Sequence, residues 1–160
     1  MIILVMGVTG VGKTTVGQAL AQKLHWQFAD ADDFHSPENV AKMQAGIPLD
    51  DADRAPWLQA LRESIMQWIA EGRSAVLACS ALKEAYRRQL VAGPNVKVVW
   101  LQAEYEVIER WLAERHGHYM NPALLRSQFE TLEPPRDAVS IDANQNVPEV
   151  VAAIRWELGV

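Results

Sequence analysis

The apolar run Met1-Ile2-Ile3-Leu4-Val5-Met6 is followed directly by Gly7-Val8-Thr9-Gly10-Val11-Gly12-Lys13-Thr14. The first six residues are rich in β-branched side chains, which predicts a strand that is buried on both faces. After the glycines, Val16, Leu20 and Leu24 recur at helical spacing, so a helix is expected to follow the loop. A buried strand, a glycine-rich loop and a helix in this order predict the first unit of a parallel sheet.

The rest of the chain repeats this alternation of strands and helices. Short apolar runs predict four further strands, at 27–29, 75–79, 96–101 and 139–141. Apolar residues at helical spacing predict helices between and after them, near 58–69, 83–91, 105–112, 124–132 and 150–158. Strands that alternate with helices form parallel sheets with right-handed crossovers. The sequence therefore predicts an α/β fold with a parallel five-stranded sheet flanked by helices.

The composition limits the class of protein. The 160 residues include 15 Lys and Arg against 20 Asp and Glu, which gives a formal net charge of −5, and 49% of them are hydrophobic. These values predict one globular domain, 1–160, and exclude a disordered, collagen-like or coiled-coil chain. The acidic balance argues against nucleic acid as a partner, and no apolar run in the sequence is long enough to predict a membrane span. Cys79 is the single cysteine, which fits a reducing compartment, so a cytoplasmic protein with a buried, non-nucleophilic thiol is expected.

The segment from Gly7 to Thr14 matches the pattern G-x-x-x-x-G-K-[ST] without a mismatch. Backbone N–H groups of such a loop, together with the N-terminus of the next helix, hold the β-phosphate of a nucleotide. The lysine reaches the β- and γ-phosphates, and the hydroxyl after it binds Mg²⁺. The alternative is a glycine-rich turn that binds nothing. We predict a loop that binds ATP with Mg²⁺, formed by Gly7, Val8, Thr9, Gly10, Val11, Gly12, Lys13, Thr14 and Thr15.

Aspartates follow the second predicted strand, where open α/β sheets bind their ligands. Asp30 and Asp32 would point to the same side if the extended backbone continued through both residues. One carboxylate could then orient Mg²⁺, with Thr14 and Asp30 as the candidate metal ligands, and the other could accept the proton of an attacking hydroxyl. A solvated turn that caps a helix is the alternative interpretation.

The polar segment at about 35–56 contains several prolines and a glycine, which predicts a loop-rich insertion that binds a substrate around a short helix. His35 could contact the substrate or cap the next helix, and both interpretations stay open. Arg54 opposes the dipole at the start of the following helix, with Pro56 expected in its first turn. An arginine in that unfavourable position favours a role in binding a substrate anion.

Further cations lie later in the chain. Ser80 and Lys83 follow the third predicted strand and could bond a polar substrate or a phosphate, and Arg87 lies on the next helix. Arg110 and Arg115 flank a polar segment, and mobile arginines that close over a nucleotide stabilise the charge that develops on the γ-phosphoryl oxygens. Surface charges on an amphipathic helix are the alternative for these two arginines.

Seven segments together resemble the gluconate kinase family. They follow the family's order over nearly the whole chain: the glycine-rich loop, Asp30-Ala31-Asp32, His35 to Met43, Gly46 to Leu58, Cys79 to Lys83, Gly117 to Met120 and Ser127 to Glu133. The resemblance implies a P-loop kinase fold like that of nucleoside monophosphate kinases and shikimate kinases, usually as a homodimer, with a lid at about 115–135. It also implies transfer of the γ-phosphoryl group of ATP to the 6-hydroxyl of D-gluconate, with Mg²⁺.

The resemblance also implies roles for single residues. The expected catalytic residues are Lys13, Asp32, Asp30, Arg110 and Arg115, with the proton passing to Asp32 or to Asp30. The expected substrate-binding residues are Asp32, His35, Lys42, Arg54, Ser80, Lys83, Arg87, His118 and Gln128. The chain departs from the family at Ala31, where glycine is usual, and after Glu133, where an acidic stretch is shortened.

Two other functions stay open at this point. A kinase of another small metabolite, such as shikimate or a nucleoside monophosphate, would share the fold. A nucleotide-binding regulator without catalysis would need neither the paired aspartates nor the lid arginines. Asp142-Ala143-Asn144 follows the last predicted strand, where related kinases hold adenine.

Overall fold

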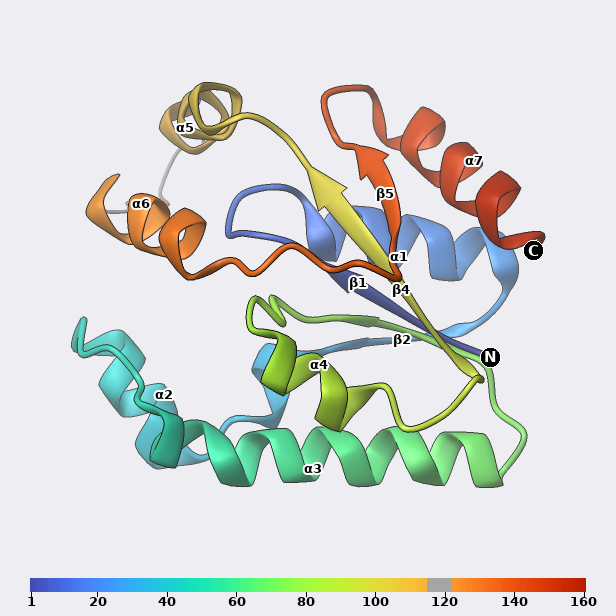
Figure 1. The fold of residues 1–160 in the computed structure, drawn as a ribbon, viewed down its shortest axis with the longest axis horizontal. Coiled ribbons are helices and arrows are strands. Elements are labelled where there is room, and N and C mark those ends of the chain that lie inside the picture. The colour runs from blue at the N-terminus through green and yellow to red at the C-terminus, as the bar shows by residue number, and fades with distance from the viewer. Residues whose placement is uncertain (115–121) are drawn as a thin grey trace.

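Parallel strands form the centre of the computed structural model, which describes residues 1–114 and 122–160 (Figure 1). The five strands within these residues pair in the order β2-β3-β1-β4-β5, and each neighbouring pair is parallel. They are β1 (Ile2–Met6), β2 (Gln27–Asp30), β3 (Ala75–Ala78), β4 (Val96–Gln102) and β5 (Val139–Asp142). Each strand overlaps an apolar run, so the predicted sheet is confirmed.

Helices cover both faces of this sheet (Figure 1). On one face lie α1 (Lys13–Leu24) and α7 (Val147–Leu158), and on the other lie α3 (Asp51–Ala70) and α4 (Glu84–Leu90). Three further helices surround the carboxyl end of the sheet: α2 (Pro37–Gln44), α5 (Tyr105–Glu114) and α6 (Pro122–Thr131). Within the described part of the chain, no helix combines the length and the apolar composition that crossing a bilayer would require.

The central strand β1 contributes to two hydrophobic cores. Ile3 and Val5 pack in the core beneath α1 and α7, whereas Ile2, Leu4 and Met6 pack in the core beneath α3. All five side chains have 0% exposure. A parallel strand that is covered on both faces has no solvent side, which explains why its sequence is apolar without alternation.

Helix α3 begins earlier than its proline indicates. The Asp50 carboxylate accepts a hydrogen bond from the backbone N–H of Asp53 at 2.7 Å, and the Asp53 carboxylate accepts one from the backbone N–H of Asp50 at 3.1 Å. This reciprocal cap fixes the start of the helix at Asp51. Pro56 therefore lies inside the helix and not in its first turn, and the end of the segment 35–56 is helical rather than loop.

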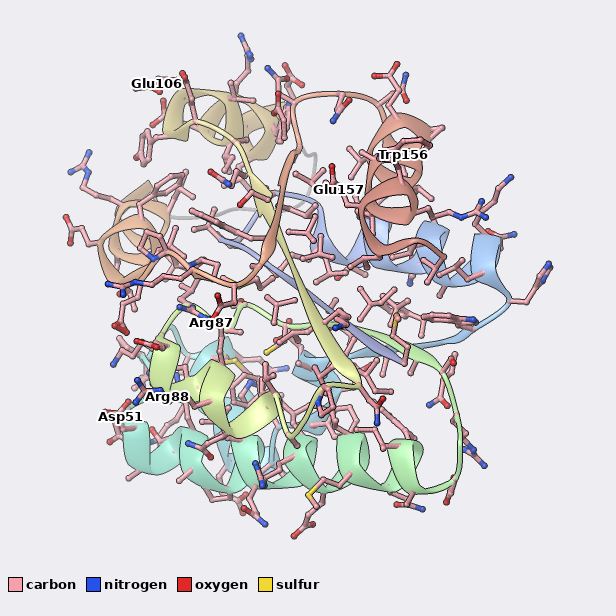
Figure 2. All side chains as sticks on the ribbon, turned by 45° about the vertical axis from the view of Figure 1, so that its right-hand side comes forward. Asp51, Arg87, Arg88, Glu106, Trp156 and Glu157 are labelled. Carbon is pink, nitrogen blue, oxygen red and sulfur yellow. The ribbon has the colours of Figure 1, made fainter. Side chains whose placement is uncertain are left out.

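Arg87, labelled in Figure 2, was predicted to bind the substrate, and in the structure its side chain holds backbone segments together. Its side chain is buried, with a residue exposure of 6%, and Nη1 donates to the carbonyl oxygens of Ala81 at 2.7 Å and Leu82 at 3.0 Å. Nη2 donates to the carbonyl oxygen of Glu133 at 2.6 Å. Burial lowers the pKa of this guanidinium below its ordinary value. The hydrogen bonds of the guanidinium therefore join the loop after β3 to the segment after α6.

Replacing Arg87 by alanine is expected to destabilise the fold by about 3 kcal/mol. The reason is that the carbonyl groups of Ala81, Leu82 and Glu133 would lose their charged hydrogen-bond donor. Arg88→Ala is the matched control on the same helix. Arg88 has a 75% exposed side chain and pairs only at the surface with Glu84, so a change below about 0.5 kcal/mol is expected. Urea unfolding of both variants measures the difference, and equal midpoints would contradict the structural role of Arg87.

Candidate active site

The glycine-rich loop leaves β1 and enters α1, as the pattern requires. Gly10 and Gly12 have φ angles of +80° and +97°, a region that side chains rarely adopt. A Cβ atom on Gly10 would lie 2.8 Å from Cδ2 of Leu112, so α5 packs directly against the loop. The strand, loop and helix context predicted for a phosphate-binding loop is confirmed.

Polar groups of this loop bond to the protein itself in the structure. Nζ of Lys13 donates to the carbonyl oxygen of Val8 at 3.0 Å. Oε1 of Gln128, from α6, accepts a hydrogen bond from the backbone N–H of Thr9 at 2.6 Å. Gln128 was predicted to bind the substrate, and the structure places its amide on the phosphate-binding loop.

Asp30 connects the loop to the end of β2. Thr14 Oγ1 donates to Asp30 Oδ2 at 2.8 Å, and Asp30 Oδ1 accepts from the backbone N–H of Asp32 at 2.9 Å. The extended backbone ends at Asp30 and continues as a 3₁₀ turn, Ala31–Phe34. The strand alternation assumed for the two aspartates is therefore wrong, because Asp30 caps the turn that carries Asp32.

The two carboxylates are nevertheless close enough to interact. Partial burial and repulsion by Asp30 raise the pKa of the Asp32 carboxyl above its ordinary value, while the charges of Lys13 and His35 oppose this shift. The pKa of Asp32 thus depends on a charge of the phosphate-binding loop, Lys13, and on a charge at the start of the segment 35–56, His35. A carboxylate in this position can accept a proton from a group held between these two parts of the chain.

An ion pair joins α2 to α3 among the described residues. Nζ of Lys42 lies 2.9 Å from Oδ1 of Asp53 and 2.9 Å from Oδ2, so the ammonium group bridges the two helices. Hydrogen bonding to Asp53 raises the pKa of Lys42, and hydrogen bonding to Lys42 lowers the pKa of Asp53. Lys42 was predicted to bind the substrate, and in the structure its charge is paired with Asp53.

Arg54 belongs to a second polar cluster, between α3 and α4. Its Nη1 donates to Oη of Tyr86 at 3.1 Å, and the Tyr86 hydroxyl donates to Oδ1 of Asp51 at 2.6 Å. Nζ of Lys83 lies 3.6 Å from the same oxygen of Asp51, which Figure 2 labels at the start of α3. Two predicted cations, Arg54 and Lys83, are thus brought together. Tyr86, which links them, was not predicted because only the tertiary fold places it beside Arg54.

His35 stacks on Trp57 with ring centroids 4.5 Å apart and an interplanar angle of 12°. Trp57 is fixed in turn, because its Nε1 donates to the carbonyl oxygen of Ala31 at 2.7 Å. Burial is the main cause that lowers the pKa of His35, with Asp32 opposing the shift and Arg54 adding to it. His35 therefore lies where the 3₁₀ turn Ala31–Phe34 meets α3.

The other predicted site residues lie after β3, on α5 or outside the described residues. Ser80 is half-buried two residues after the end of β3, and Arg110 is exposed on α5. Arg115 and His118 lie outside the described residues, as does the first part of the lid predicted at 115–135. A cavity of about 520 Å³ opens at the carboxyl ends of β4 and β5, lined by Gln102, Ala103, Glu104, Val107, Ser140, Asp142 and Asn144.

Comparisons with known proteins agree with this arrangement. A family model described as shikimate kinase matches residues 9–149. The thermosensitive gluconokinase of Escherichia coli (strain K12) is 41% identical over 157 residues, which cover 95% of this chain and 84% of that protein. The crystal structure of a gluconokinase from Sinorhizobium meliloti 1021 superposes with a TM-score of 0.89 at 40% identity, covering 98% of this chain and 90% of that one. Shikimate kinase from Aquifex aeolicus vf5, with a TM-score of 0.62 and 16% identity, shares the fold.

Cys79 is expected to resist alkylation in the folded protein. Burial raises the pKa of its thiol to about 12, so the buried group stays a thiol at pH 8 and offers almost no thiolate for reaction. Labelling with iodoacetamide, followed by mass spectrometry, should be very slow for native protein and fast in guanidinium chloride. Rapid labelling of the native protein would show that Cys79 is a reactive thiol after all.

Proposed function

Because the chain belongs to the gluconokinase family, we propose that it transfers the γ-phosphoryl group of ATP to the 6-hydroxyl of D-gluconate, which gives 6-phospho-D-gluconate. The observation that carries this proposal is the hydrogen-bonded path from Thr14 through Asp30 to Asp32. It joins the phosphate-binding loop to the segment that the family resemblance assigns to the sugar acid. Gluconate phosphorylation would place the protein in carbohydrate metabolism.

The phosphate side of the site suits MgATP. Thr14 and Asp30 offer a hydroxyl and a carboxylate oxygen 2.8 Å apart, and oxygen donors are what Mg²⁺ prefers. Thr14 would hold Mg²⁺ with Asp30 behind it, and the bound ion would offset phosphate charge. Lys13 would exchange the Val8 carbonyl for the β- and γ-phosphates.

The transfer step needs a base for the attacking hydroxyl, and we assign that role to Asp32. Asp30 already accepts hydrogen bonds from Thr14 and from the Asp32 backbone, whereas no such bond engages the Asp32 carboxylate among the described residues. As the 6-hydroxyl oxygen bonds to the γ-phosphorus, its proton passes to Asp32 and the bond to the β–γ bridging oxygen breaks. ADP is the leaving group.

The acceptor side is assigned to the segment 35–56 and the residues that face it. Arg54 is the best candidate for binding the gluconate carboxylate, because its guanidinium fork matches a carboxylate and its nearest anion, Asp51, is 3.9 Å away. His35, Lys83 and Ser80 would bind hydroxyl groups around it. Lys42 would act mainly by holding α2 against α3.

Three further assignments complete the proposal. The cavity beside Asp142 and Asn144 would hold the adenine base, since it opens at the same edge of the sheet as the phosphate-binding loop. Arg110 would approach the phosphates, together with a lid in the segment 115–135. We also propose a homodimer in the cytoplasm, which rests on the family resemblance and on the single, buried cysteine.

The two alternatives from the sequence are less favoured. Relatives named as gluconokinases match almost the full chain at 40–41% identity, against 16% for the shikimate kinase from Aquifex aeolicus vf5. A regulator without catalysis would not need an aspartate beside the phosphate-binding loop and next to a cluster of cations. Gluconate phosphorylation is therefore the function that the site supports best.

Acceptor specificity gives the direct test of this function. Purified protein with MgATP is expected to release ADP when D-gluconate is added, and to release little with shikimate or a nucleoside monophosphate. A coupled ADP assay across these acceptors measures the rates, and mass spectrometry identifies the phosphorylated carbon. No gluconate-dependent ADP release would refute the proposal, and ATP binding without turnover on any acceptor would favour the regulator.

Replacing Asp32 by asparagine is expected to lower kcat by about 10²–10⁴-fold, because the amide cannot accept the proton. ATP affinity should stay near the wild-type value, since the loop contacts are untouched. Asp33→Asn is the matched control: it removes the same charge from the neighbouring exposed position and should preserve turnover. Steady-state kinetics and nucleotide titration provide the measurements, and full turnover by Asp32→Asn would move the base to another residue.

A further inference from the structure

Asn39 is a polar residue buried in α2, with an exposure of 5%. Its Nδ2 donates to the carbonyl oxygen of Asp53 at 2.8 Å. A carbonyl oxygen can only accept, so this contact fixes which end of the Asn39 amide faces α3. The same Nδ2 lies 3.4 Å from Nδ1 of His35. Since an amide nitrogen carries two hydrogens, one can donate to Asp53 while the second is left for Nδ1 of the histidine ring.

This arrangement selects one form of the imidazole. An N–H group that faces Nδ1 of His35 needs a lone pair there, so the ring proton belongs on Nε2. In the cationic ring Nδ1 also carries a hydrogen, which would point at the Asn39 N–H and repel it. Asn39 therefore favours a neutral His35 with a single donor, Nε2–H.

The surroundings of His35 also favour the neutral ring. The ring lies flat against Trp57, so tilting it out of that plane would lose the stack. Among the described residues, the charged groups that act on it are Asp32, from the turn Ala31–Phe34, and Arg54, from α3, and their effects on the pKa oppose one another. The carboxylate of Asp53, behind Asn39, is paired with Lys42. Burial then keeps the pKa of His35 below its ordinary value.

We infer that Asn39 is a positioning residue, which holds His35 as the Nε2–H tautomer so that it donates to a hydroxyl oxygen of the acceptor. This inference rests on the proposed function for the identity of that acceptor, a polyhydroxy acid. A hydroxyl group that accepts from His35 keeps its own hydrogen for a second partner, and the Asp32 carboxylate interacts with the same ring. His35 is thus a neutral donor that orients a hydroxyl, and neither the base nor a cation for the carboxylate.

The tautomer can be observed without any substrate. Long-range ¹H–¹⁵N NMR spectra of protein labelled at histidine nitrogens, with His35→Gln to assign the signal, should show His35 protonated at Nε2 alone near pH 7. In Asn39→Asp the residue beside Nδ1 becomes an acceptor, so we expect the proton on Nδ1 or a cationic ring, with a raised pKa. Asn39→Ala, which removes the donor without adding charge, should give mixed tautomers and covers the case in which Asn39→Asp does not fold.

Kinetics of the same variants test the consequence for the acceptor. Asn39→Ala is expected to raise the KM for gluconate about tenfold while the KM for ATP stays constant, as loss of one oriented hydrogen bond predicts. Glu38→Gln, an exposed change on the same helix, is the control and should leave both values unchanged. An Nδ1–H or cationic ring in the wild type, or an unchanged tautomer in both Asn39 variants, would overturn the inference. Wild-type protein that shows the Nε2–H form but does not phosphorylate gluconate would instead refute the proposed function.

Discussion

The hydrogen bond from Thr14 to Asp30 is the contact on which the geometry of the site depends. It joins the first turn of α1 to the last residue of β2, and the other oxygen of Asp30 starts the turn that carries Asp32. The same turn offers the Ala31 carbonyl to Trp57, on which His35 stacks. A displacement of Asp30 would therefore move the phosphate-binding loop, the proposed base and the acceptor segment relative to one another.

The acidic residues of the acceptor segment serve the fold as well as the chemistry. Asp53 caps α3 through its carboxylate, pairs with Lys42 and presents its carbonyl to Asn39. Asp51 accepts from Tyr86 and lies near Lys83 and Arg54. The net charge of −5 thus includes carboxylates whose charge is balanced locally. In the proposed function an anionic substrate would approach paired cations and anions rather than an acidic surface, so the negative net charge is compatible with anionic ligands.

Local patterns in the sequence predicted most of the fold, because strand runs and helical spacing are determined by neighbours in the chain. The details that differ from the predictions follow from side-chain contacts, which the apolar pattern does not report. The arrangement of Asp30 and Asp32 follows from a side-chain cap, and the role of Arg87 follows from carbonyl groups of Leu82 and Glu133 on separate segments. Tyr86 and Asn39 carry no signal of their own in the sequence, since their polar contacts form only when α2, α3 and α4 assemble.

The contact between Gln128 and Thr9 joins residues that are 119 positions apart. The glutamine oxygen thereby occupies a backbone N–H group of the glycine-rich loop. In the proposed nucleotide complex, a phosphate oxygen that accepted from the Thr9 N–H would displace the glutamine oxygen, so the apparent affinity for nucleotide would equal the intrinsic affinity reduced by the stability of that internal contact. The linkage is reciprocal. A substitution that held α6 more firmly on the loop would then weaken nucleotide binding, and bound nucleotide would weaken the hold of α6 on the loop by the same factor.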